Sequence, residues 1–326
     1  MKKKYLIFSF IAVLFISCET DFDVNAEWEA ITVVYGLLDA STDTQYIKIN
    51  KAYLGEGDAM MMAQYSDSIN FNPNNLKVEL HKLVSNDTLL SITLDTTLID
   101  KEDGLFAVDN NIIYRAVIPT GFLTNNNTYS ITMKDYLSSN EVSSNTGLIS
   151  NFSFKNFNSA YKFGFYNPSL VDSAKFRSKT ILWEKVKNGE VYQLDVRFNY
   201  LENGVLKSLV WSQGEEVFVG SDAMQTKLEG IKLFNFLSLE LNDMTFQGIR
   251  SFVNLDLVMT VGTEDLNTYI KINEPITGIT QQRPQFTNIK NGIGLFSSRY
   301  THVEYNIDLT QDTKNYLIDK LDRNFQ

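Results

Sequence analysis

The sequence is short of the residues from which many proteins build their sites. Its 326 residues include one cysteine, two histidines and five prolines. A disulfide needs two cysteines, and the commoner zinc sites take several ligands from cysteine and histidine, so counting excludes both architectures. Acidic residues outnumber basic ones by 39 to 29, which leaves no basic footprint for nucleic acid. We therefore expect no nucleic-acid partner, no metal and no cofactor.

Long hydrophobic runs are also missing, except for one near the N-terminus. Three lysines at positions 2–4 precede an uncharged segment, residues 5–16. A helix needs about twenty residues to cross a bilayer, so this segment is too short to span and is typical of a secretory signal peptide. It ends in Leu14-Phe15-Ile16-Ser17-Cys18, which resembles the bacterial lipobox, with Phe15 where leucine is usual.

The single cysteine stands at the one place that the lipobox requires. We predict removal of residues 1–17 and acylation of Cys18, the only covalent group we expect; the alternative is a buried cysteine behind an ordinary signal sequence. Cleavage removes three lysines and leaves 26 basic against 39 acidic residues. A protein this acidic is repelled by anionic headgroups, so the lipid has to hold it at the membrane.

Acidic residues follow the cysteine immediately. Glu19, Asp21 and Asp23 lie in the expected lipidated tether, residues 18–27. They resemble the acidic export signal by which Bacteroidota send lipoproteins to the cell surface, whereas the alternative is a plain solvated linker. We predict a lipid-anchored outer-membrane protein that faces the cell exterior.

The first predicted domain, residues 28–149, consists of strand patterns. Short apolar or alternating segments recur there with Asn, Asp, Gly and Pro between them, which is typical of an immunoglobulin-like β-sandwich, here without a disulfide. The expected strands are residues 31–38, 76–83, 89–94, 105–108, 113–118 and 128–133.

The second predicted domain, residues 150–326, mixes strands and helices. It opens with an aromatic-rich connection at 150–168, followed by an alternating strand at 192–200 and a hairpin at Asn203-Gly204. Asp222 and Gln225 form a capping-box pattern that predicts a helix over 222–232. Further helices are expected at 264–274 and after Thr310, with a strand at 252–261. The predicted fold class is mainly β with some α, a sandwich followed by an α+β domain.

One C-terminal stretch carries a family resemblance. It consists of Asn267-Thr268-Tyr269-Ile270-Lys271, then Pro284, then residues 288–297 with the sequence NIKNGIGLFS. With the lipidated start and the sandwich, this resembles a family of Bacteroidota outer-membrane lipoproteins of unknown function, commonly encoded beside TonB-dependent receptors. The resemblance implies a β-barrel partner in the outer membrane and supplies no catalytic residues.

The chemistry-bearing residues suggest no active site. A serine–histidine–aspartate triad would have to use His81 or His302, both expected on exposed or edge faces, and neither has a nucleophile elbow to pair with. Gly292 and Gly294 are spaced like the start of a dinucleotide fingerprint, but a turn feeding a strand is favoured. We expect no catalytic residues and no enzyme.

A methionine-rich segment is the best candidate for a partner contact. Met60, Met61 and Met62, with Tyr65 nearby, lie in a polar insertion between expected strands. Methionine adapts to irregular surfaces, although the segment can equally fold back on its own core. The function we predict is a non-enzymatic accessory, scaffold or substrate-capture subunit of an outer-membrane β-barrel machine: a TonB-dependent transporter, a barrel-assembly complex or a secretion complex. The alternative is a surface enzyme that processes glycans or peptides.

Overall fold

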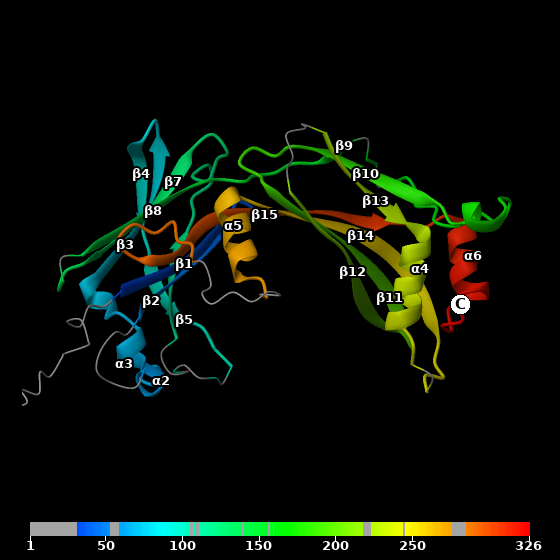
Figure 1. Cartoon of the computed structure of the whole chain (residues 1–326), viewed down its shortest axis with the longest axis horizontal. Helices are drawn as coiled ribbons and strands as arrows, with labels where there is room; N and C mark the ends of the chain where they lie inside the picture. Colours follow the sequence, from blue (N-terminus) through cyan, green and yellow to red (C-terminus); the bar gives the residue numbers. More distant parts are fainter. Residues whose placement is uncertain are drawn as a thin grey trace, which may run out of the picture.

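The computed structural model confirms the fold class: it is mainly β with a few short helices (Figure 1). It describes residues 31–52, 59–102, 104, 107, 111–138, 140–155, 157–158, 160–217, 223–243, 245–275 and 285–326. The strands are β1 (Ile31–Asp39), β2 (Thr44–Ala52), β3 (Leu76–Val84), β4 (Asp87–Thr93), β5 (Asp95–Leu98), β6 (Ile112–Val117), β7 (Thr128–Asp135), β8 (Glu141–Gly147), β9 (Phe154–Lys155), β10 (Ser178–Glu184), β11 (Val191–Glu202), β12 (Val205–Val217), β13 (Ala223–Glu229), β14 (Arg250–Gly262) and β15 (Ile293–Ile307). The helices are α2 (Ala59–Met62), α3 (Ser66–Ile69), α4 (Gly230–Glu240), α5 (Glu264–Asn273) and α6 (Gln311–Asp319), with 3-10 turns η1 (Pro73–Asn75) and η2 (Asp172–Lys175).

The N-terminal strands form an immunoglobulin-like sandwich. One sheet has the order β1-β2-β6-β5 and the facing sheet the order β4-β3-β7-β8, which correspond to strands A-B-E-D and C′-C-F-G of that fold. Tyr129, at the start of β7, donates its hydroxyl to the carbonyl oxygen of Phe122 (2.7 Å) and accepts from the amide of Thr124 (2.7 Å). This is the tyrosine corner of immunoglobulin-like domains, and it fixes the loop that leads into strand F.

β15, near the end of the chain, joins this sandwich to the C-terminal part. It pairs in parallel with β1 and antiparallel with β14, so that one sheet runs through the molecule in the order β12-β11-β14-β15-β1-β2-β6-β5. Phe296 in β15 belongs to the core of the sandwich, whereas Ile307 at its other end belongs to the C-terminal core. Figure 1 shows β15 and β14 extending between the two halves.

The C-terminal core lies on the same face of that sheet as the sandwich core. Alternate residues of β11 (Tyr192, Leu194, Val196, Phe198 and Tyr200) are buried there, against β9, β10 and β13 and the apolar sides of α4 and α6. The Asn203-Gly204 hairpin is confirmed: both residues have positive φ (52° and 83°), as a two-residue turn between twisted strands requires.

The predicted helix over 222–232 is wrong in its first half. Residues 223–229 form β13, paired antiparallel with β10, and the helix begins at Gly230. Met224 and Leu228 are four apart, a spacing that places side chains on one side of either a helix or a strand, so the pattern could not decide between them. Gly230 has no room for a side chain, because a Cβ would lie 2.4 Å from the carbonyl oxygen of Phe165.

The other helix predictions are confirmed. α5 is capped by Thr263, whose Oγ1 accepts from the amide of Leu266, and α6 follows Thr310. The expected strands at 31–38, 76–83, 89–94, 113–118, 128–133 and 252–261 are present, whereas 105–108 falls largely outside the described residues. Strands β2, β5, β8, β9 and β10 were not anticipated, and β13 replaces part of a predicted helix.

Candidate functional site

The eight-stranded sheet buries one face and leaves much of the other uncovered. In β1, Val34 and Leu38 point into the sandwich core, while Tyr35 between them is 43% exposed on the opposite side. In β2, Ile47 and Ile49 are buried and Tyr46 is 46% exposed. We call the side that carries the two tyrosines the open face. Aromatic side chains of this size on a solvent-facing sheet are typical of surfaces that bind something.

Helix α5 lies on the open face and is held there by polar contacts. Asn288 donates to the Oδ2 of Asp265 in α5 (2.9 Å) and to the carbonyl oxygen of Phe296 in β15 (2.7 Å), and its own Oδ1 accepts from the Phe296 amide (3.0 Å). The hydroxyls of Thr263 and Ser297 are also hydrogen-bonded to each other, and Ser297 is fully buried. These bonds fix the N-terminal end of α5 to the sheet.

This anchoring brings Tyr269 of α5 against Tyr35 of β1. The rings meet edge to face with centroids 6.0 Å apart, and the Tyr269 hydroxyl donates to that of Tyr35 (3.3 Å). The hydrogen bond from Tyr269, with burial, raises the pKa of Tyr35 to about 12. Tyr35 is therefore neutral throughout the physiological range, and the pair offers ring surface and hydroxyls.

The tyrosine pair separates two cavities on the open face. The larger, of about 590 Å³, lies between α5 and β2 and is walled by Tyr35, Tyr46, Leu266 and Ile270. Arg299 lines it too, and its guanidinium makes no hydrogen bond or ion pair with any residue that the structure describes. The smaller, of about 330 Å³, lies on the other side of the pair. We call the larger cavity with its walls the tyrosine groove.

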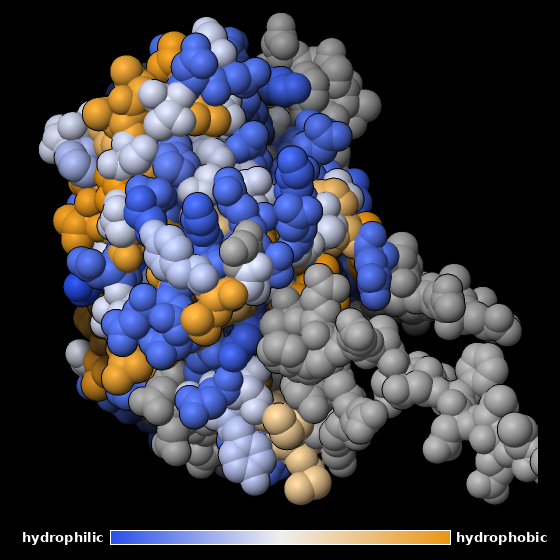
Figure 2. Space-filling model, turned by 90° about the vertical axis from the view of Figure 1, so that its left-hand side faces the viewer, coloured by the Kyte–Doolittle hydropathy of each residue, from blue (hydrophilic) through white to orange (hydrophobic). Residues whose placement is uncertain are grey.

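The predicted methionine contact borders the same face. Met60, Met61 and Tyr65 are 55%, 60% and 61% exposed, whereas Met62 is half-buried. At the bottom of Figure 2, apolar atoms protrude where α2 lies at the bottom of Figure 1. The structure thus presents Met60, Met61 and Tyr65 to solvent.

The methionine segment is tied to the outer side of β2. Asn50 donates to the carbonyl oxygen of Ile69 (2.9 Å) and Lys51 to that of Asp67 (2.9 Å). Beneath it lies a cavity of about 370 Å³ that shares Lys48 with the tyrosine groove. Burial and the nearby charge of Lys101 lower the pKa of Lys48, whose ammonium donates to Asn111 Oδ1. The two surfaces are therefore adjacent.

The histidines lie elsewhere, and neither occupies an edge strand. His81 is in β3, between β4 and β7, and contacts the hydroxyls of Ser91 and Thr132 at 2.7 Å each. His302 is in β15, beyond the part that pairs with β1; it lies opposite Met259 of β14 and beside the ring of Phe152. His81 lies on the outward face of β3, opposite buried Leu80, as expected, whereas the His302 side chain is only 18% exposed. Burial lowers the pKa of His81, which disfavours its charged form.

The predicted lipidation and export residues, Cys18, Glu19, Asp21 and Asp23, lie outside the described residues, as do the signal segment 1–17 and the tether 18–27. Among the residues that the structure does describe, no helix is long and apolar enough to cross a membrane. The same residues contain no cluster of three or more His, Cys, Asp or Glu side chains that could hold a metal ion.

No family model matches the chain, and no curated protein matches it.

Proposed function

We propose that the protein is a non-enzymatic, lipid-anchored accessory subunit of an outer-membrane β-barrel machine. The lipobox-like sequence ending at Cys18 and the acidic residues after it support the location. The partner in this proposal is a barrel protein of a TonB-dependent transporter, a barrel-assembly complex or a secretion complex.

The tyrosine groove is the observation that carries the proposal. Protein interfaces are enriched in tyrosine, methionine and arginine at their centres, where a few such side chains contribute most of the affinity. Tyr35, Tyr46 and Arg299 line the groove, and Met60 and Met61 are exposed on the adjoining segment. The unpaired guanidinium of Arg299 favours a partner segment that presents a carboxylate beside apolar side chains.

Affinity purification of the full chain from outer membranes tests the proposal. A C-terminal tag suits the design, because the C-terminus lies beside α6, at the far end of the molecule from the sandwich (Figure 1). We expect a barrel protein in stoichiometric amount by mass spectrometry. Recovery of the lipoprotein alone, with a hydrolytic activity that a carboxylate substitution abolishes, would favour the alternative of a surface enzyme and overturn the proposal.

Substitutions in the groove sharpen the test. Tyr46→Asp places a charge among the groove's apolar walls and should reduce recovery of the barrel protein about tenfold or more, as loss of a central contact does. The matched control is Tyr161→Asp, since Tyr161 is an exposed tyrosine outside the groove, 63% exposed against 46% for Tyr46. Equal recovery with both variants would exclude the groove as the binding surface.

Membrane attachment has its own measurement. Cys18→Ala should release the protein from the membrane fraction, because no other hydrophobic anchor is proposed. Protease treatment of intact cells should degrade the wild-type protein, and complete protection of it under conditions that cleave a known surface protein would place it on the periplasmic side.

A further inference from the structure

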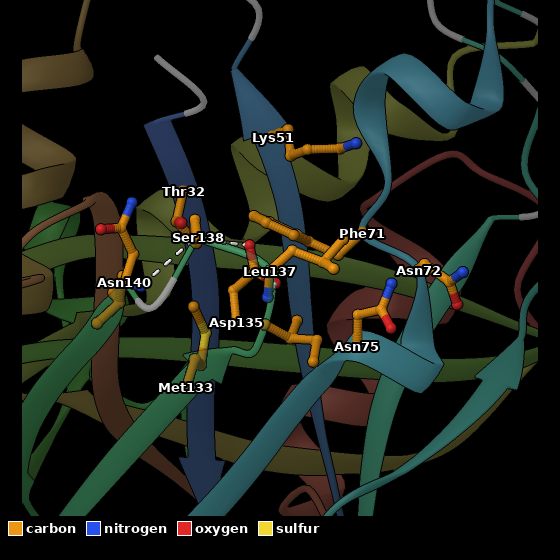
Figure 3. A pocket seen from close by; sticks show the side chains of 12 residues that line it. Thr32, Lys51, Phe71, Asn72, Asn75, Met133, Asp135, Leu137, Ser138 and Asn140 are labelled. Carbon is orange, nitrogen blue, oxygen red and sulfur yellow. Dashed lines mark hydrogen bonds between the residues drawn. The ribbon is translucent and has the colours of Figure 1, made fainter.

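A separate cavity opens at the end of the sandwich where β1 begins, the end that faces the viewer in Figure 2. It has a volume of about 440 Å³ and lies between the β2–β3 connection and the β7–β8 hairpin (Figure 3). In the strand nomenclature of the immunoglobulin fold these are the B–C and F–G loops, which lie at the antigen-binding end of variable domains. We call this cavity the end pocket.

The walls of the end pocket are held in place by the chain itself. Asp135 accepts from the amide of Leu137 (3.0 Å) and from the hydroxyl of Ser138 (2.7 Å), which shapes the hairpin. The amide of Tyr136 donates to the carbonyl oxygen of Asn75 (2.9 Å), which ties the hairpin to the start of β3. A site that is formed before its ligand arrives loses little affinity to ordering.

The two ionisable side chains in the end pocket already make hydrogen bonds within the protein. Among its described lining residues, only Lys51 and Asp135 are ionisable. The Lys51 ammonium donates to the carbonyl oxygen of Asp67 and lies 5.6 Å from the centroid of the Phe71 ring. Both oxygens of Asp135 accept hydrogen bonds from the hairpin. One of these groups is a cation and the other an anion, so the ionisable lining carries no net charge, which favours a neutral ligand.

Its amides, in contrast, are available. The side chains of Asn75 and Asn140 make no hydrogen bond with any described residue, and the Asn72 side chain uses only its oxygen, as acceptor for the amide of Asn74. Each such amide offers two donors and one acceptor. Hydroxyl groups, which both donate and accept, complement this set.

Most of the remaining lining residues of the end pocket are apolar. Phe71 and Leu137 lie side by side in Figure 3, with Asn75 and Asn140 on either side of them in that view. Leu76, Met133 and Val142 also line the pocket, and Thr32 and Ser138 add two hydroxyl-bearing side chains. A sugar ring has the matching properties, a rim of hydroxyls around faces of C–H groups. The volume lies within the ~300–1,000 Å³ of small-molecule sites.

We propose that the end pocket binds a neutral saccharide of one or two rings. Asn75 and Asn140 bind its hydroxyls, and Phe71 and Leu137 contact its C–H faces. An extended peptide is disfavoured, because peptides that add to a β-structure use the backbone of a free strand edge, whereas the available groups here are side-chain amides.

Saturation-transfer NMR on the full chain tests this with defined probes. The panel is glucose, galactose, mannose, N-acetylglucosamine, maltose and cellobiose, with glucuronate and trialanine as charged and peptidic comparisons. We expect transfer to at least one neutral saccharide. Absence of saturation transfer to every neutral saccharide, or transfer only to glucuronate or trialanine, overturns the proposal.

Variants locate the binding. Asn75→Ala with Asn140→Ala should weaken binding of the responding saccharide about tenfold or more, because each lost neutral hydrogen bond costs roughly a factor of five. Asn315→Ala on α6 is the matched control and should bind like the wild type. Leu137→Asp gives a second route, since this side chain is 78% exposed and its replacement leaves the core intact. Unchanged affinity in both the amide and the Leu137 variants would exclude the end pocket.

Discussion

Gly294 lies in β15 opposite Val34 of β1, its parallel neighbour. Replacing Gly294 with alanine tests whether the two halves of the molecule depend on the pairing of these two strands. The φ of Gly294 is +117°, a region that residues with a side chain rarely adopt. A Cβ at this position would lie 2.0 Å from the carbonyl oxygen of Val34 and 2.9 Å from its carbonyl carbon. Alanine therefore meets both backbone strain and the backbone of the neighbouring strand.

The expected loss of stability follows from the backbone strain and from the contact with the neighbouring strand. A residue held in a sparsely populated backbone region costs about 1–3 kcal/mol. Relieving a contact of 2.0 Å requires β1 and β15 to separate by about 1 Å, which weakens neighbouring ladder hydrogen bonds worth about 0.5–1.5 kcal/mol each. We expect a loss of about 3 kcal/mol or more in the free energy of unfolding, and a midpoint lowered by about 6–12 °C in a chain of this size.

Thermal unfolding followed by circular dichroism measures the effect. Gly104→Ala is the matched control, because a Cβ there would have nothing within 4 Å and its φ is not positive. Both halves should lose stability in Gly294→Ala, since β15 contributes side chains to both cores. If Gly294→Ala and Gly104→Ala unfold at the same temperature, the parallel pairing of β1 with β15 is not as described and the argument fails.

Three further predictions concern single side chains. Tyr269→Phe removes the hydroxyl that shares a hydrogen bond with Tyr35, so the pKa of Tyr35 should fall below about 12, while burial keeps it above its ordinary value. In the wild type this raised pKa contributes stability below pH 10 that is lost as the pH rises toward 12. Ultraviolet titration of tyrosinate absorbance in the wild type and the variant measures the change in pKa. Burial alone would raise the pKa of Asp308, but hydrogen bonds from Lys162 and Lys314 outweigh burial and lower this pKa to about 2. The free energy of unfolding should therefore fall as the pH drops from 4 through 2. Asp308→Asn should remove that pH dependence in acid-unfolding curves. Leu257→Ala should cost about 2–5 kcal/mol in urea unfolding, because this side chain is fully buried in the C-terminal core; a cost below 1 kcal/mol would contradict its placement.

Local sequence patterns were sufficient for most individual elements. Asn203-Gly204 predicted its hairpin because the turn requires two positive φ angles, and Thr263 predicted the start of α5 because its hydroxyl satisfies an amide of the first turn. The pattern failed over 222–229, where two apolar residues four apart suit a helix and a strand equally.

The long-range arrangement was beyond such patterns. β1 pairs with β15 through residues such as Val33 and Ile293, and no local periodicity reports a parallel contact between segments so far apart. The tyrosine groove depends on this contact, because α5 precedes β15 and reaches Tyr35 only when β15 lies beside β1. The exposure of Tyr35 could not be predicted, because it lies in a continuous apolar run that is typical of a strand buried on both faces. The methionine segment could be identified because its three methionines interrupt a polar sequence.

The proposed anchor determines which surfaces lie near the membrane. From Cys18 to Ile31 the chain advances 13 positions (31 − 18), which at ~3.3–3.6 Å per residue cannot exceed about 47 Å in any conformation. Under the proposed acylation of Cys18, the start of β1, the end pocket beside it and the adjoining methionine segment would lie within that reach of the membrane. A partner embedded in the same membrane therefore meets the N-terminal sandwich, while α4 and α6 lie at the opposite end of the molecule (Figure 1). Because β15 contributes to both cores and pairs with β1 and β14, backbone hydrogen bonds connect the sandwich to the C-terminal half without a break in the sheet.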